Sequence, residues 1–497
     1  MPANSPSRRM PVLFRTAPQA TMPNTFFWHD YETFGISPRR DRPAQFAGIR
    51  TDADLNEIGE PLMCYCQPAP DYLPDPESCL LTGILPQTCV EQGMPEHQFA
   101  AVIERELAET GTIGVGYNTL RFDDEVTRFM FWRNLIDPYA REWQNDCGRW
   151  DLLDVVRTTW ALRPEGIEWP KHEDGRPSFK LEHLTQANGL LHEAAHDALS
   201  DVHATIALAR LIKSKQPKLW DFCLALRKKE AVLKEIDLLN PKPLLHISGM
   251  FGPERGCMAI VWPLAQHPTN KNEIIVWDLA CDPEALAELS ADEIRTRMFT
   301  KAADLPEGVS RLPVKTIHIN KSPIVVANLK ILSPEVVARW QIDIPQALIH
   351  ADQARRLPAL AAKWAAVFQR PAEEGATDVD EDLYGGFVGN GDRRTLNQLR
   401  GLTPEQLGEA RVSFQDARLE EIFFRYRARN FPASLDASEQ ARWEAHRVAC
   451  LHEGANGARS LTAFFEQIDT LSEAADERGE AILGALYDYA EAIAPPF

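Results

Sequence analysis

Residues 25–35, "TFFWHDYETFG", constrain the fold of this chain more than any other stretch. Their aromatic content favours a β-strand, yet Asp30 and Glu32 interrupt it. Side chains alternate along a strand, so both carboxylates lie on one face, roughly 6–7 Å apart. Buried together and ionised, they repel each other and lose hydration. The segment is therefore either an edge strand with a solvated polar face or a buried strand in which the acids face a cation or one of them is protonated.

Length and charge limit the class of protein. A chain of 497 residues predicts two to four domains. With 44% hydrophobic and 25% charged residues, the chain is typical of folded globular proteins, and no apolar run reaches the ~20 residues of a membrane helix. A net charge of −19 argues against non-specific binding of duplex nucleic acid but leaves room for a locally basic groove. Residues 1–24 read as a disordered tail, with Met22 as an alternative start.

The nine cysteines are scattered and contain no CxxC pair, which predicts a reducing compartment, the cytoplasm. Cys64 and Cys66 lie on one face of an expected strand, and we interpret them as packing residues.

The first part of the chain alternates strand and helix patterns, which predicts a mixed α/β sheet. Strands are expected at residues 25–33, 44–51, 62–67 and 112–118. Helices are expected at residues 96–109, 123–135, 151–163, 181–189 and 197–215, with Gly189 ending the fourth.

The pattern changes near Pro217. A helical linker precedes strands separated by Pro and Gly, such as "PLLHISGMF" and "EIIVWDL", which predict a small antiparallel barrel. From about Ser333 the pattern is mostly helical. We place the domain boundaries at residues 25–215, 216–365 and 366–497.

Metal-assisted phosphoryl hydrolysis needs several converging carboxylates and a proton acceptor. The α/β part offers Asp30, Glu32, Asp123, Asp201 and, in the loop before the last helix, His196. Each has an ordinary alternative: Asp123, Asp124 and Asp197 suit helix starts, and His196 and Asp201 suit the surface. Four acids and a histidine in one small α/β unit favour a site, with Asp197 starting the helix.

In order, the segments "HDYET", "GYNTLRFDDEV" and "AHDALSD" resemble the DEDDh 3′→5′ exonucleases. The closer resemblance is to the bacterial exonuclease I family, through "DRPAQFAGIRTD", "ALRPEGI", "HISGMFG", "HINKSP" and "YRARNFP". It covers nearly the whole chain after the N-terminal tail. It implies a ribonuclease-H-like mixed-sheet exonuclease domain, then an SH3-like β-barrel and an α-helical C-terminal domain.

The resemblance also implies roles for the site residues. Asp30, Glu32, Asp123 and Asp201 would hold two Mg²⁺ ions, with Mn²⁺ as a substitute, and Glu32 would also contact the substrate. His196 would be the general base, a role that suits its unperturbed pKa. The reaction would release 5′-mononucleotides from the 3′ end of single-stranded DNA, in DNA repair and recombination. On this interpretation strand 25–33 is central, with an aromatic face against the sheet's core and the acids on the other face.

Contacts to single-stranded DNA are implied at positions that supply cations and aromatic rings. These are Arg128, Tyr139, Trp143, Arg157 and Lys180. Lys180 stands where the family often has arginine, and its ammonium group cannot make the bidentate phosphate contact of a guanidinium. The family also binds the acidic C-terminal tail of single-stranded-DNA-binding protein, and Arg163 is the expected contact. A strand-binding groove within one chain predicts a monomer.

Two questions stay open in the sequence. The basic run "RYRARNF" (Arg425, Arg427 and Arg429) suits either a DNA contact or a domain interface. The rival functions are another DEDDh nuclease, acting on short RNA or in proofreading, and a non-enzymatic single-stranded-DNA-binding scaffold. The domains after residue 215 argue against the first rival, and the intact set of five site residues argues against the second.

Overall fold

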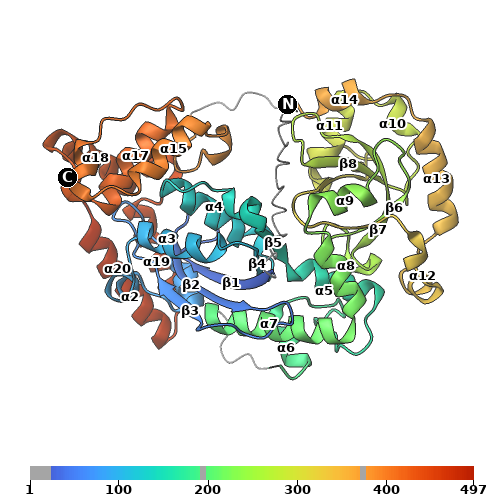
Figure 1. The fold of residues 1–497 in the computed structure, drawn as a ribbon, viewed down its shortest axis with the longest axis horizontal. Coiled ribbons are helices and arrows are strands. Elements are labelled where there is room, and N and C mark those ends of the chain that lie inside the picture. Colours follow the sequence, from blue (N-terminus) through green and yellow to red (C-terminus); the bar gives the residue numbers. More distant parts are fainter. Residues whose placement is uncertain (1–23, 191–196, 370–376, 497) are drawn as a thin grey trace, which may run out of the picture.

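The computed structural model describes residues 24–190, 197–369 and 377–496. Figure 1 shows three parts side by side: a central α/β part, a β-rich part on one side and a helical part on the other. None of the helices in the described ranges combines the length and apolar character needed to cross a membrane.

The central part contains a five-stranded mixed sheet, ordered β3-β2-β1-β4-β5. Its strands are β1 Thr25–Thr33, β2 Pro43–Thr51, β3 Leu62–Tyr65, β4 Thr112–Gly116 and β5 Gly148–Asp151. β1 pairs antiparallel with β2 and parallel with β4. The acidic segment is therefore the central strand, and the edge-strand alternative is wrong. The sequence pattern missed β5, whose four residues, "GRWD", are too few to show a period.

The two faces of β1 are both aromatic, so the prediction of a single aromatic face is wrong. Phe26 and Trp28 alternate onto the same face as Asp30, whereas Phe27 and Tyr31 pack in a separate apolar cluster on the other face. A central strand covered by helices on both sides buries both of its faces, so aromatic residues suit both.

Helices cover this sheet (Figure 1). They are α1 Pro76–Thr82, α2 Pro86–Gln92, α3 Glu96–Leu107, α4 Asp123–Arg133, α5 Leu152–Leu162, α6 Leu181–Ala187 and α7 Ala198–Lys215. The last five match the predicted helices, whereas α1 and α2 were not predicted. Gly189, with φ of +62°, ends α6 as expected. α7 packs across β1 and β2, and this packing brings the last predicted acid to the sheet.

The β-rich part is joined to the central part by α8 (Pro217–Ala225) and α9 (Lys229–Glu235). Its curled antiparallel sheet has the order β10-β6-β7-β8-β9. The strands are β6 Leu244–Ile247, β7 Met258–Gln266, β8 Glu273–Asp278, β9 Val314–His318 and β10 Ile324–Val326. Its helices are α10 Ala285–Glu288, α11 Ala291–Phe299, α12 Pro334–Trp340, α13 Ile344–Arg356 and α14 Ala361–Val367.

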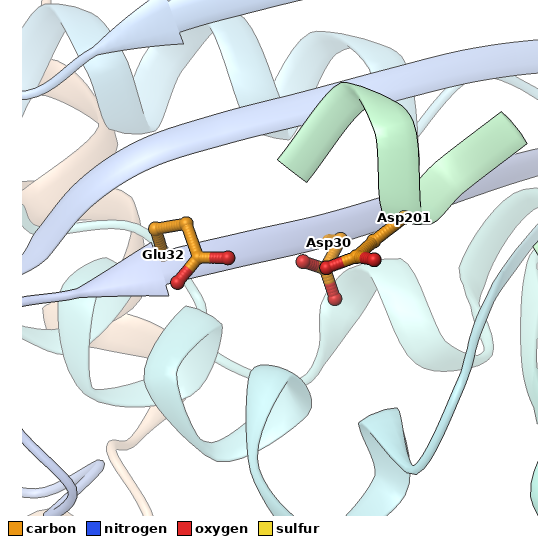
Figure 2. Close-up of side chains that lie close together, drawn as sticks. All are labelled: Asp30, Glu32 and Asp201. Atoms are coloured by element: carbon orange, nitrogen blue, oxygen red, sulfur yellow. The ribbon is translucent and has the colours of Figure 1, made fainter. Parts of the chain in front are cut away.

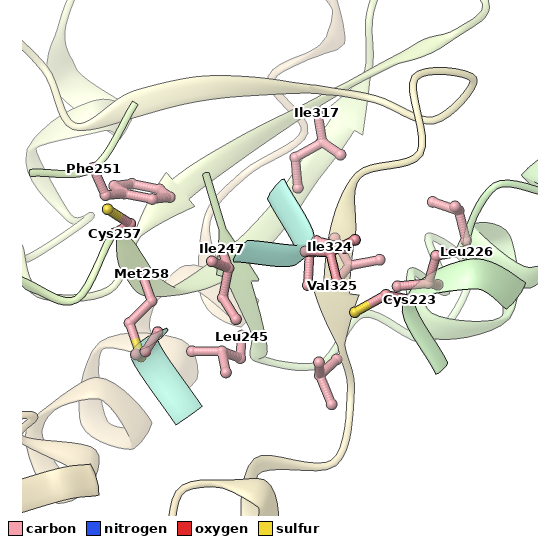
Figure 3. Packing of buried hydrophobic residues seen from close by; sticks show 14 of the residues in the cluster. Cys223, Leu226, Leu245, Ile247, Phe251, Cys257, Met258, Ile317, Ile324 and Val325 are labelled. Carbon is pink, nitrogen blue, oxygen red and sulfur yellow. The ribbon is translucent and has the colours of Figure 1, made fainter. Parts of the chain in front are cut away.

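One apolar cluster runs from the central part into the barrel. It contains Cys223 and Leu226 from the linker beside Leu245, Ile324 and Val325 of the barrel (Figure 3). Each of these side chains is almost wholly buried. The barrel is therefore fixed to the central part by a shared core.

The C-terminal part is helical, as predicted. Its helices are α15 Asn390–Leu399, α16 Pro404–Glu409, α17 Arg418–Asn430, α18 Ala437–Leu451, α19 Leu461–Ser472 and α20 Glu477–Ile493. The three predicted architectures, a mixed α/β sheet, an antiparallel barrel and a helical end, are confirmed. All nine cysteines are free thiols, and Cys64 and Cys66 are buried packing residues as interpreted.

The run "RYRARNF" lies on α17 at an interface with the central part. Arg429 Nη2 is 2.7 Å from Asp71 Oδ2 and 2.6 Å from Asp380 Oδ2. Arg425 pairs with Asp378 at 2.7 Å, and Arg427 pairs with Glu439. Arg425 and Arg427 are buried, and the side chain of Arg429 is only 6% exposed. The structure thus places Arg429 at the interface with the central part, the second of the two alternatives, whereas Arg425 and Arg427 pair with acids of the C-terminal part itself.

Candidate metal centre

The candidate site is formed by two strand residues and one helix residue. Asp30 and Glu32 project from β1, and Asp201 projects from the first turn of α7 toward them (Figure 2). One carboxylate oxygen from each lies within 4.8 Å of those of the other two. Carboxylate oxygens at this spacing are the ligands preferred by hard divalent cations. The donor set therefore fits such an ion.

The sheet also fixes the start of α7. Asp197 caps the helix, as predicted, because its carboxylate accepts the Ser200 N–H at 3.1 Å. Gln45, buried in β2 opposite Glu32, accepts the Ala198 N–H at 3.2 Å. Because Gln45 belongs to the strand that pairs with β1, its bond fixes the position of the first turn of α7 relative to the acids of β1. Sequence reasoning missed Gln45, which had no signal beyond a polar residue within an apolar strand.

Asp123 lies beside this cluster, at the first residue of α4. It is buried, and its Oδ1 accepts the backbone N–H of Tyr31 at 3.2 Å, between the two strand acids. The three-carboxylate cluster found among the described residues does not include Asp123. Asp123 nevertheless raises the pKa of both Asp30 and Glu32. It is thus close enough to interact with them electrostatically.

Burial and mutual repulsion perturb these acids strongly. Burial, then Asp123 and Glu32, raise the pKa of Asp30 well above its usual value. Burial and Asp201 raise the pKa of Glu32 to about 8, and burial raises the pKa of Asp123 to about 8. Such perturbation is characteristic of functional sites. In the absence of a cation, burial and repulsion therefore favour the protonated forms of Glu32 and Asp123 at neutral pH.

This perturbation predicts an unusual pH dependence of stability. A raised pKa means that the folded protein binds more protons than the unfolded chain. Stability of the metal-free protein should therefore fall as the pH rises from about 4, the ordinary pKa of a carboxyl, through about 8. The loss should be on the order of 1 kcal/mol for each unit by which the pKa of each group is raised. Thermal unfolding in EDTA across this range measures the slope. Added divalent cation should flatten it, and an equal slope with and without the cation would contradict this site.

His196, the predicted general base, lies outside the described residues. Its role stays a prediction.

A buried charge network stands behind the site. Asp124 accepts from Arg141 at 2.5 Å and from Arg149 at 3.0 Å, and the arginines hold its pKa below the usual range against the effect of burial. Arg149 also donates to the carbonyl of Asn320 in the barrel at 3.2 Å. The network therefore links the start of α4 to the barrel. The only sequence signal for it was the second aspartate in "FDDE".

Arg128, a predicted DNA contact, belongs to the same network. It makes a bidentate pair with Glu142 at 2.7 and 2.9 Å and a bond to Glu125 at 2.7 Å, and it is buried. Tyr384 of the C-terminal part contacts the same guanidinium at 3.1 Å. A phosphate contact would require one of these pairs to open, and the DNA role of Arg128 stays a prediction.

The other predicted contacts occupy different surroundings. Tyr139 is half-buried, with its ring 5.9 Å from that of Phe387, whereas the Trp143 side chain is 65% exposed. Arg157 pairs with Asp154 at 2.7 Å and packs against the backbone of Gly249 in the barrel.

Lys180 and Arg163 lie at helix ends. Lys180 is exposed at the start of α6, with its Nζ 3.3 Å from Glu182. Arg163 follows α5 and donates to the Leu162 carbonyl at 2.5 Å. The described geometry brings neither to the carboxylates, and both roles stay predictions.

A mixed sheet that carries clustered carboxylates on its central strand, covered by a helix that adds another, is an arrangement that suits metal-assisted phosphoryl hydrolysis. Residues 27–209 match the profile of the exonuclease family. Residues 227–370 match the Exonuclease I SH3-like domain, and residues 377–493 match the Exonuclease I C-terminal domain.

The relatives agree with these profiles. Exodeoxyribonuclease I of Escherichia coli is 46% identical over 473 residues, which cover 95% of this chain and 98% of that relative. The chain therefore belongs to the exodeoxyribonuclease I family.

Solved structures give the same result. E. coli Exonuclease I in complex with a dA16 oligonucleotide is similar with a TM-score of 0.90 and 45% identity, over 95% of this chain and 100% of that one. A solved ExoI/SSB-Ct complex is similar with a TM-score of 0.88 and 45% identity at the same coverage. The zinc-ion-bound form of an E. coli ExoI–ssDNA complex has a TM-score of 0.89 and 45% identity, also at that coverage.

Proposed function

We propose that this protein is a Mg²⁺-dependent, processive 3′→5′ exodeoxyribonuclease that degrades single-stranded DNA to 5′-mononucleotides. The observation that carries the proposal is the buried cluster of Asp30, Glu32 and Asp201 on the fold of the exodeoxyribonuclease I family. A role in DNA repair and recombination belongs to the same proposal. The nine free cysteines support a cytoplasmic location.

The reaction breaks the terminal phosphodiester. The oxygen of a water molecule attacks phosphorus, the bond from phosphorus to the 3′-oxygen breaks, and that oxygen takes a proton. Two Mg²⁺ ions, held by Asp30, Glu32, Asp123 and Asp201, would supply positive charge for the phosphoryl and leaving oxygens and lower the pKa of water. Mn²⁺ is the expected substitute.

The protein's own groups perform the remaining tasks. We assign His196 to accept the proton of the attacking water, because a neutral imidazole is available near pH 7. Glu32 would also contact the terminal nucleotide. Gln45 and the Asp197 cap keep Asp201 in register with β1, and the bond from Tyr31 N–H keeps Asp123 beside it.

Partners follow from the same similarity. Single-stranded DNA is bound in a structure of a relative, and the SSB C-terminal segment is bound in another. We propose Arg163 as a contact for that acidic tail, and Arg128, Tyr139, Trp143, Arg157 and Lys180 as contacts for DNA.

The proposal is tested by metal removal with three substrates. Wild-type protein should release 5′-mononucleotides from 3′-labelled single-stranded DNA with Mg²⁺, lose this activity in EDTA and recover it when Mg²⁺ is added back. Duplex DNA and short RNA should be degraded far more slowly. Mononucleotide release is followed by chromatography. Preference for short RNA would instead support the rival DEDDh activity, and tight DNA binding with no metal-dependent release would support a scaffold.

A further inference from the structure

Two histidines of the central part lie close together in a region that contains none of the metal-centre carboxylates. His172 lies in the turn of residues 170–178, and His183 lies in the first turn of α6. Their ring centres are 5.9 Å apart, with the ring planes at 68°. Both line a hollow of about 670 Å³. Imidazole rings are common ligands of transition-metal ions, so this pair is a candidate for a metal site of its own.

The turn of residues 170–178 fixes the backbone of His172. Lys171 and Pro177 form an antiparallel bridge, and the His172 N–H donates to the carbonyl of Arg176 at 2.8 Å. Gly175, with φ of +81°, reverses the chain, and its N–H donates to the carbonyl of His172 at 2.9 Å. The side chain of His172 is exposed on this backbone. Its ring is therefore held near α6 but is able to turn.

The ring of His183 is oriented by a buried hydroxyl. Ser178 is 1% exposed, and its Oγ lies 2.8 Å from Nδ1 of His183. When Nδ1 donates its proton to this oxygen, the lone pair on Nε2 is available to a metal ion, which is the usual arrangement of a ligating histidine. Nε2 lies 3.5 Å from Oε1 of Glu182. A nitrogen and a carboxylate oxygen are thus already side by side.

These spacings suit one tetrahedral ion. Zinc bonds of about 2.0–2.2 Å, at tetrahedral angles, place a nitrogen and an oxygen ligand about 3.4 Å apart and two ring centres about 5–6 Å apart. The measured 3.5 Å and 5.9 Å agree with both values. Within the described residues, only the acids of the metal centre already bring three ligand atoms within 4.8 Å of one another. The exposed ring of His172 therefore has to turn to complete this second set.

The surrounding charges leave room for a cation. Oε1 of Glu182 also contacts Nζ of Lys180 at 3.3 Å, but that lysine side chain is 63% exposed and its contact contributes little. Asp174 is paired with Arg176 at 2.6 Å, whereas Glu173 is exposed next to His172 and lines the same hollow. A bound ion would therefore displace one exposed lysine contact, and Glu173 or water would supply a further oxygen.

We propose that His172, His183 and Glu182 form a second metal site, for a transition-metal ion such as Zn²⁺, that fastens the turn of residues 170–178 to α6. Nitrogen ligands favour Zn²⁺, whereas Mg²⁺ prefers oxygen, so this site differs in chemistry from the carboxylate centre. The inference does not rest on the proposed function, because none of its three residues takes part in the reaction described above.

Calorimetric titration of the full chain with Zn²⁺, in the presence of excess Mg²⁺, tests this site. His172→Ala should weaken the binding of one Zn²⁺ at least about tenfold, and Ser178→Ala, which removes the group that orients His183, should weaken it about tenfold. His203→Ala, which removes an exposed histidine from α7, should bind Zn²⁺ as wild type does. Zn²⁺ should also raise the melting temperature of wild type more than that of His172→Ala.

Two outcomes would overturn the inference. One is equal zinc affinity and stoichiometry in wild type and His172→Ala. The other is zinc binding that only Asp201→Ala removes, because the ion would then occupy the carboxylate centre. Since His172 is exposed, its alanine variant should melt at the wild-type temperature without metal and release nucleotides with Mg²⁺ as wild type does. If wild type releases no nucleotides while zinc binding still depends on His172, only the proposed function fails.

Discussion

Replacing Asp201 by alanine should reduce metal-dependent release of nucleotides from single-stranded DNA by at least about a thousandfold. Its carboxylate is one of three whose oxygens lie within 4.8 Å of each other, and it is the only one that comes from α7. Removing it takes away a ligand and a charge that no neighbouring residue of the helix replaces. Single-turnover hydrolysis of a 3′-labelled oligonucleotide, over a range of Mg²⁺ concentrations, measures the loss.

Stability gives this prediction its control. Asp201 raises the pKa of Glu32 by repulsion, so its removal should leave the metal-free protein at least as stable as wild type at pH 8. Thermal unfolding in EDTA tests this directly. Asp221→Ala, which removes an exposed carboxylate from α8, should retain full activity. Near-wild-type turnover of the Asp201 variant, or a loss of activity that follows a loss of folding, would contradict the site.

Most of this centre was predictable because it depends on periodicity and on helix starts. Alternation along β1 places Asp30 and Glu32 on one face, and the cap at Asp197 places Asp201 in the first turn of α7. The meeting of these elements was not predictable from local pattern. It depends on Gln45, which joins β2 to the start of α7 across 153 residues of sequence.

The buried charges were the least predictable feature. Arg128 and Arg429 appear in the sequence as surface cations suited to phosphate. Yet Arg128 is buried against Glu125 and Glu142, and the Arg429 side chain, only 6% exposed, lies against Asp71 and Asp380. No local pattern reveals such partners, because burial of a charge depends on which acids the tertiary fold brings to it. The resemblance to a family supplied a role for Arg128 but not its surroundings, and it left the role of Arg429 open.

Replacing Arg429 by alanine should destabilise the docking of the C-terminal part by about 3–5 kcal/mol, because it removes the guanidinium that two buried carboxylates share. Asp71 then has no arginine partner in the described part of the chain, whereas Asp380 keeps Arg42 and Arg425. Asp71 and Asp380 are buried, and despite burial the Arg429 guanidinium holds the pKa of each well below its usual range. Chemical denaturation and the protease sensitivity of α17 and α18 measure the loss. Arg478→Ala, at an exposed position of α20, should change little.

The pH dependence of that loss distinguishes an interface from a DNA contact. Acids with lowered pKa values stabilise the fold above their ordinary pKa of about 4 and lose this contribution as the pH falls toward the folded values. The difference between wild type and Arg429→Ala should therefore be full at pH 7 and shrink below about pH 4. A DNA contact would behave oppositely: binding of single-stranded DNA would weaken while stability stayed constant at every pH. The interface loses stability as the pH falls, whereas the metal centre loses stability as the pH rises. Measuring the stability of the metal-free protein across the pH range therefore assesses both.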